Sequence, residues 1–165
     1  HYYYRSKQKL FLAVFRRLAP KMFSSILQIL KDDLPLFEKI RRFVYSYIDE
    51  ISKKNKHIPL FIISELERNP ESIAEVLNDT FKTMDFDPVE TFTEEVNREI
   101  AAGNIREIDP RQLFVNVISL SIFPFIGRPI IKKVGQFTDE EYDIFLQERK
   151  TSVAEFVINS IKINK

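Results

Sequence analysis

The chain contains no cysteine and no tryptophan, and its 165 residues include only three glycines and two histidines. Without cysteine it has no disulfide framework and no thiolate chemistry. Tight turns with positive φ depend on glycine, so the low glycine content argues against β-sandwiches, β-barrels and glycine-rich phosphate loops. A catalytic triad or a zinc site based on imidazole would have to use His1 or His57, and no metal-ligand or nucleophile motif surrounds either residue. We therefore expect no enzyme activity, no metal and no cofactor.

Long apolar runs and a charge excess are also absent. The 25 basic and 24 acidic residues leave a net charge of +1, whereas a purely electrostatic nucleic-acid binder is expected to be basic. The longest apolar stretch, residues 113–126, is interrupted by polar residues and is shorter than the ~20 residues that a transmembrane helix needs. The first twelve residues do not resemble a signal peptide. These features predict a cytoplasmic protein that does not contact a membrane.

The chain does contain clear signals for the starts of helices. Asn69, Asp87 and Asp109 each precede a proline, which places a capping side chain before a residue suited to the first helical position. Thr138 followed by Glu141 matches a capping box. The sequence therefore predicts that four helices begin at these points.

Apolar periodicity and the glycines complete this prediction. Gly103, Gly127 and Gly135 each follow an apolar segment, where a left-handed glycine commonly ends a helix. Apolar residues recur with helical spacing in nine segments: 10–18, 22–30, 36–51, 60–66, 73–84, 89–100, 110–123, 129–134 and 139–163. Pro20 separates the first two segments, so we expect a helix to end there. The prediction is an all-α fold with eight or nine helices.

Residues 113–126 are apolar on nearly every side, so a helix of this sequence must be covered all round. Pairing with the helix of residues 139–163, and of both with a second copy, would form a four-helix bundle and a homodimer. The residues predicted at this interface are Phe114, Ile118, Ile122, Phe145, Arg149, Val153, Phe156 and Val157. The alternative is a monomer in which this helix is central.

The first seven residues, HYYYRSK, resemble the end of the helix-turn-helix signature of TetR/AcrR-like transcriptional regulators. In that family the recognition helix ends in Tyr-x-His-Phe-x-Ser-Lys, with leucine three residues later. The matching positions are Ser6, Lys7 and Leu10, whereas His1, Tyr3 and Tyr4 replace the family's Tyr, His and Phe. The order of the predicted helices that follow, with an apolar penultimate helix and a long last helix, also resembles the family's ligand-binding and dimerisation domain.

This resemblance implies that residues 1–6 are the tail of a helix-turn-helix domain and that residues 7–165 bind a ligand and dimerise. It implies a ligand-responsive DNA-binding regulator, in most such cases a repressor, with Tyr2, Tyr3 and Lys7 contacting DNA phosphates. Ser6 would cap a helix from Lys7 to Leu18 that couples the ligand to the DNA reader. The alternative for these residues is aromatic packing and a solvated lysine.

The family's ligand pocket lies among the middle helices, and we expect a small apolar or aromatic effector there. The candidate lining residues are Phe37, Tyr47, Phe61, Phe81, Phe92, Asn116 and Ser119, and for each of them the alternative role is core packing. The alternative function is a stand-alone helical module that binds a ligand or another protein. A DNA-reading domain upstream in the gene would separate the two functions.

Overall fold

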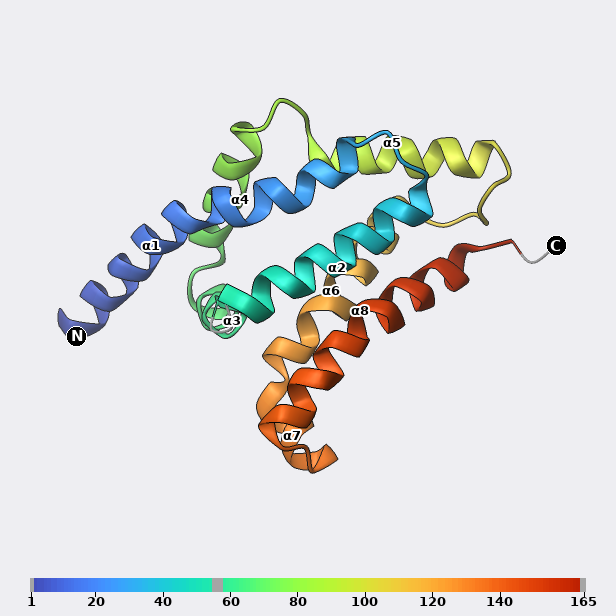
Figure 1. Ribbon diagram of the computed structural model, residues 1–165. Helices are drawn as coiled ribbons and strands as arrows, with labels where there is room; N and C mark the ends of the chain where they lie inside the picture. The colour runs from blue at the N-terminus through green and yellow to red at the C-terminus, as the bar shows by residue number, and fades with distance from the viewer. Residues whose placement is uncertain (1, 55–57, 164–165) are drawn as a thin grey trace.

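The computed structural model describes residues 2–54 and 58–163, and within these ranges every regular element is helical (Figure 1). The elements are α1 (Tyr2–Leu27), the 3₁₀ helix η1 (Gln28–Lys31), α2 (Leu36–Lys54), α3 (Ile58–Arg68), α4 (Pro70–Lys82), α5 (Pro88–Ala101), α6 (Pro110–Ile126), α7 (Arg128–Gly135) and α8 (Asp139–Ile161). The only β-type pairing among the described residues is an isolated bridge between Ile105 and Lys162. The predicted all-α class and helix number are confirmed.

Helix α1 differs from the prediction at both ends. It continues through Pro20 to Leu27, and its helical backbone already includes Ser6, so no helix starts at Lys7. Proline inside a helix removes one backbone hydrogen bond and its ring clashes with the carbonyl four residues earlier, so packing has to offset this cost. The helix continues because Ala19 and Met22, on either side of Pro20, are both buried against neighbouring helices. The predicted break at Pro20 and the predicted cap at Ser6 are therefore wrong.

The predicted helix starts are mostly confirmed by their hydrogen bonds. The Asp87 carboxylate accepts from two backbone N–H groups of α5, and that of Asp109 accepts from one of α6. Thr138 and Glu141 form the complete capping box of α8. Asn69 precedes α4, but its side chain makes no capping bond, so proline alone marks that start.

Only one of the three glycines has the predicted left-handed conformation. Gly103, with φ of 70°, follows the end of α5 as expected. Gly127 has φ of −80°, and the left-handed residue after α7 is Gln136 rather than Gly135. Gly135 has a different role, because a Cβ atom there would overlap the ring of Phe137.

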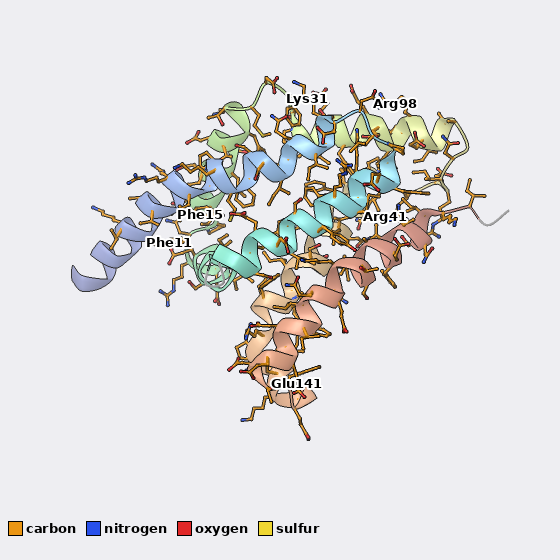
Figure 2. All side chains as sticks on the ribbon, in the orientation of Figure 1. Phe11, Phe15, Lys31, Arg41, Arg98 and Glu141 are labelled. Atoms are coloured by element: carbon orange, nitrogen blue, oxygen red, sulfur yellow. The ribbon has the colours of Figure 1, made fainter. Side chains whose placement is uncertain are left out.

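The buried residues form two separate clusters. The main cluster joins α2, α5, α6 and α8 and also takes in the C-terminal end of α1. Helices α2 and α8 run antiparallel and are linked by Arg41–Glu155 (2.8 Å) and Tyr45–Thr151 (2.7 Å), with Arg41 visible between the two helices (Figure 2). The second cluster joins the middle of α1 to α4 and contains the buried residues Phe15, Ala19, Ile73 and Val76.

A buried ion pair lies where α1 ends and the main cluster begins. The Lys39 ammonium donates to the Glu95 carboxylate at 2.7 Å and to the carbonyl of Leu30, at the end of η1, at 3.0 Å. The two side chains are only 9% and 8% exposed. This pair ties η1, α2 and α5 together.

Candidate functional site

A cavity of about 210 Å³ lies between the two clusters. Five helices contribute to its wall: α1, α2, α3, α4 and α6. Every described lining residue is apolar or aromatic, and the set is Phe15, Phe23, Ile26, Leu27, Phe43, Tyr47, Ile62, Ile73, Leu77, Phe81, Phe114, Ile118 and Ile122. Such a wall suits an apolar ligand, since ligand sites are mostly apolar with a few placed polar groups.

Tyr47 supplies the only polar side-chain atom among these lining residues. The residue is 6% exposed, and its ring stacks on Phe43 with centroids 6.0 Å apart. Among the described residues no hydrogen bond to its hydroxyl is found, and burial alone raises the pKa of the Tyr47 phenol above its ordinary value. The hydroxyl is therefore protonated at neutral pH and can donate a hydrogen bond.

The position of the cavity follows from how the helices pack. Phe15 and Ile73 on one side belong to the α1/α4 cluster, whereas Phe43 and Tyr47 on the other side belong to the main cluster. Figure 2 shows Phe11 and Phe15 on successive turns of α1, and their rings stack at 5.7 Å. A change in the contents of the cavity would act first on the contact between α1 and the main cluster.

The predicted pocket residues have mixed outcomes. Tyr47 and Phe81 lie on the cavity wall. Phe37 and Phe92 instead pack in the main cluster, and Phe92 is 5% exposed. The side chain of Phe61 lies outside the described residues.

Asn116 and Ser119 were predicted as polar pocket residues, and this prediction is wrong. Both are exposed on the side of α6 that faces away from the cavity. The Ser119 hydroxyl donates to the carbonyl of Val115 at 2.6 Å, within its own helix. Helical periodicity could not show which side of α6 faces the cavity, because apolar residues surround this helix.

A second feature is an exposed face formed by α6 and α8, here called the outer face. It consists of Val115, Ser119 and Phe123 on α6 and Arg149, Ser152 and Phe156 on α8, spaced so that each set shares one side of its helix. Val115, Phe123 and Phe156 are 59%, 60% and 65% exposed. Large apolar side chains gathered in this way are typical of interaction surfaces.

Arg149 lies in a hollow of about 150 Å³ on the outer face, whose wall also includes Leu120, Ser152 and Phe156. Its guanidinium donates to the Leu120 carbonyl at 3.0 Å, but its buried Nε has no hydrogen-bond partner among the described residues. Burial lowers the pKa of Arg149, and no carboxylate in the described part of the chain offsets this. Buried donors normally have partners, so an acceptor from beyond the described residues would satisfy this one.

The predicted interface residues are divided between three environments. Arg149 and Phe156 lie on the outer face, as a dimer interface requires. Phe145 is half-buried in an aromatic cluster with Phe137 and Tyr142.

The other five residues pack within their own chain, three of them half-buried and two buried, and none belongs to the set of exposed residues on the outer face. Phe114, Ile118 and Ile122 line the internal cavity. Val153 and Val157 are 1% and 2% exposed and pack in the main cluster. For the two valines the prediction is wrong, because α8 buries this side against α2 and α6 and leaves Val153 only a place in the wall of the hollow beside Arg149.

The predicted DNA contacts cannot be placed. The backbone of residues 2–7 is part of α1, but the side chains of Tyr2, Tyr3 and Lys7 lie outside the described residues, as does His57. In the described ranges no group of three or more His, Asp or Glu side chains could hold a metal ion.

Over the same residues, no single helix is long and apolar enough to cross a membrane. Only α6 and α7 together, bent by 69°, have the required length and composition.

Comparison of the chain with models of known protein families gives no match, and comparison with curated protein sequences gives no significant match. The likeness to TetR-like regulators therefore depends on the resemblance in sequence alone.

Proposed function

We propose that this chain is the effector-binding and dimerisation part of a ligand-responsive transcriptional regulator. The observation that carries the proposal is the apolar cavity of about 210 Å³ between the α1/α4 cluster and the main cluster. A small apolar molecule has space there, and α1, which forms part of the wall, continues to the segment that resembles the end of a DNA-reading helix.

The cavity gives a physical route for control. Phe15 on α1 and Ile73 on α4 form one wall and pack against each other, so these two helices would shift together when the cavity fills. Because the backbone from Tyr2 to Phe15 is one continuous helical segment of α1, a shift at Phe15 would be transmitted to the N-terminal end of this helix. For control, the ligand has to prefer one arrangement of α1 over the other, since equal affinity for both would shift nothing.

Ligand binding is tested by thermal unfolding with a panel of small neutral aromatic compounds. A ligand present at 100 times its Kd stabilises the folded chain by about 2.7 kcal/mol, which raises the midpoint measurably. Ile118→Phe adds volume inside the cavity and should abolish the shift. The matched control is Ile144→Phe, because Ile144 is 60% exposed on α8 and lies away from the cavity. No shift with any compound would contradict the proposal.

We further propose that a second copy of the chain covers the outer face. Isologous pairing would bury Phe123 and Phe156 and bring the same face of the partner to Arg149, whose Nε lacks an acceptor among the described residues. Glu148, exposed next to Arg149 on α8, is one acceptor that such a pairing would offer. The dimer predicted from sequence is kept, but its contacts are moved to the outer face.

Phe156→Asp tests this arrangement. We expect light scattering to fall from twice the 19.6 kDa chain mass to the single mass, with the helical circular dichroism unchanged. Ile144→Asp is the control, because Ile144 is on α8 but lies away from the outer face. It shares the side of the helix on which Thr151 and Glu155 contact α2. A wild-type chain that is monomeric at micromolar concentration would exclude the dimer.

The DNA-binding part of the proposal is tested by the gene sequence that precedes His1. A helix-turn-helix there would support a regulator, and its absence would favour the stand-alone ligand-binding module. In the longer protein, Lys7→Ala should weaken binding to all DNA sequences alike and reduce the salt slope by about 1. A changed base preference with an unchanged slope would contradict a phosphate contact.

A further inference from the structure

We infer that the cavity selects a neutral, single-ring-sized apolar molecule that carries one hydrogen-bonding oxygen, and that Tyr47 binds this oxygen. The inference rests on the proposed ligand-binding function and adds the chemical class of the ligand and the residue that recognises it. It follows from the size of the cavity, from the absence of charge on its wall and from the single polar group there.

The size of the cavity limits the ligand. An apolar cavity of about 150 Å³ holds benzene, and drug-sized ligands occupy pockets of about 300–1,000 Å³. At about 210 Å³, this cavity lies between these limits. One aromatic ring with a short substituent therefore fits, whereas a fused polycyclic compound requires the two clusters to move apart.

The wall limits the charge of the ligand. None of the lining residues that the structure describes is ionised at neutral pH, because Tyr47 is the only titratable one among them and burial keeps its phenol protonated. An ion placed there would have no counter-charge, and an unpaired charge in an apolar site is strongly disfavoured. The nearby cation Lys39 is already bound to Glu95 and to the Leu30 carbonyl. Carboxylate and ammonium ligands are therefore excluded.

The Tyr47 hydroxyl explains why one oxygen is favoured. The Tyr47 side chain is buried, no hydrogen bond to its hydroxyl is found among the described residues, and this hydroxyl is the only polar side-chain group of the described wall. A carbonyl or ether oxygen on the ligand would accept its proton. A hydrocarbon of the same shape would fill the same space but leave the hydroxyl without a partner.

The experiment compares two neutral probes of similar shape, propiophenone and propylbenzene, with benzoate as a smaller charged probe, on the 165-residue chain. Affinities are measured by calorimetry with the wild-type chain, with Tyr47→Phe and with Tyr45→Phe. Tyr45 is the matched control, because it lies on the same helix but is 42% exposed and bonds to Thr151 on the surface. Propiophenone should bind the wild-type chain about three- to tenfold more tightly than propylbenzene, which is the range expected for one net hydrogen bond.

Tyr47→Phe should remove this preference and leave propylbenzene binding unchanged or slightly improved, whereas Tyr45→Phe should preserve it. Benzoate should not bind. If both neutral probes bind equally to the wild-type chain and to Tyr47→Phe, the role of Tyr47 is overturned while the ligand cavity remains. If benzoate binds more tightly than the neutral probes, the ligand class is wrong. If no probe binds and Ile118→Phe raises thermal stability by filling an empty space, the proposed ligand-binding function fails as well.

Discussion

The two clusters of this molecule differ in how firmly their helices are held together. Main-cluster helices α2 and α8 are joined along their length by buried apolar side chains and by cross-links such as Arg41–Glu155. In the α1/α4 cluster the buried residues, among those described, are Phe15, Ala19, Ile73 and Val76 alone. The surface pair Arg16–Glu75, at 3.4 Å and more than half exposed, adds little to that contact.

This difference indicates which part moves. A large buried cluster resists deformation because interiors are close-packed, whereas a small cluster beside a cavity loses few contacts when it shifts. The cavity lies between the small cluster and the main cluster. A ligand would therefore shift α1 and α4 and leave the main cluster unchanged. The predictions below test the division, from the largest expected effect to the smallest.

The largest effect on the free energy of unfolding is expected in the main cluster. Val153→Asp places a carboxylate without a partner at a position that is 1% exposed, and we expect a loss of about 4 kcal/mol or more in the free energy of unfolding. Urea titration followed by circular dichroism measures it. Phe156→Asp, three residues further along the same helix but 65% exposed, should keep its helical signal. A folded, monomeric Val153→Asp variant would restore Val153 to a dimer interface.

An intermediate effect is expected where the two regions join. Lys39→Met leaves Glu95 buried without its cation, and removal of one partner of a buried pair costs about 3–5 kcal/mol. The double variant Lys39→Met/Glu95→Met should recover most of that loss. Arg42→Met is the control, because its pair with Glu38 is exposed and should change unfolding by only about 0.5 kcal/mol.

If Lys39→Met and Arg42→Met lower the free energy of unfolding by the same amount, the buried Lys39–Glu95 pair does not stabilise the contact between η1, α2 and α5. If the double variant is as unstable as Lys39→Met, the loss comes from packing of the lysine stem and not from the unpaired carboxylate. Both outcomes are read from the same urea titrations.

The sequence predicted what depends on local chemistry. The caps at Asp87, Asp109 and Thr138 need only a side chain and the first turn that follows it, and all three are present. Tyr47 and Phe81 were found because they lie on the inner stripes of amphipathic helices.

The sequence could not show which side of a helix faces the cavity and which faces solvent. Helix α6 is apolar around its whole circumference, so no periodic stripe could show that Ile118 faces a cavity and Val115 faces solvent. Phe15 was missed as a pocket residue because the boundary between two packed clusters is a tertiary property. Pro20 was interpreted by a rule that holds for isolated helices, and the burial of its neighbours overrides that rule.

The smallest effect concerns this proline, and it decides whether α1 acts as one rigid body. In a continuous helix, Pro20→Ala restores the backbone hydrogen bond to the Arg16 carbonyl and removes the clash of the ring with it. This gain is partly offset because the unfolded chain becomes more flexible, so we expect a net stabilisation of about 1–2 kcal/mol. Pro70→Ala is the matched control, since Pro70 occupies the first turn of α4, where the missing donor costs nothing, and its replacement should bring no gain. Urea titration of both variants measures the difference. If Pro20→Ala also brings no gain, α1 is broken at Pro20 in solution, and Phe15 would then move independently of Phe23 and Ile26, which line the cavity from beyond the proline.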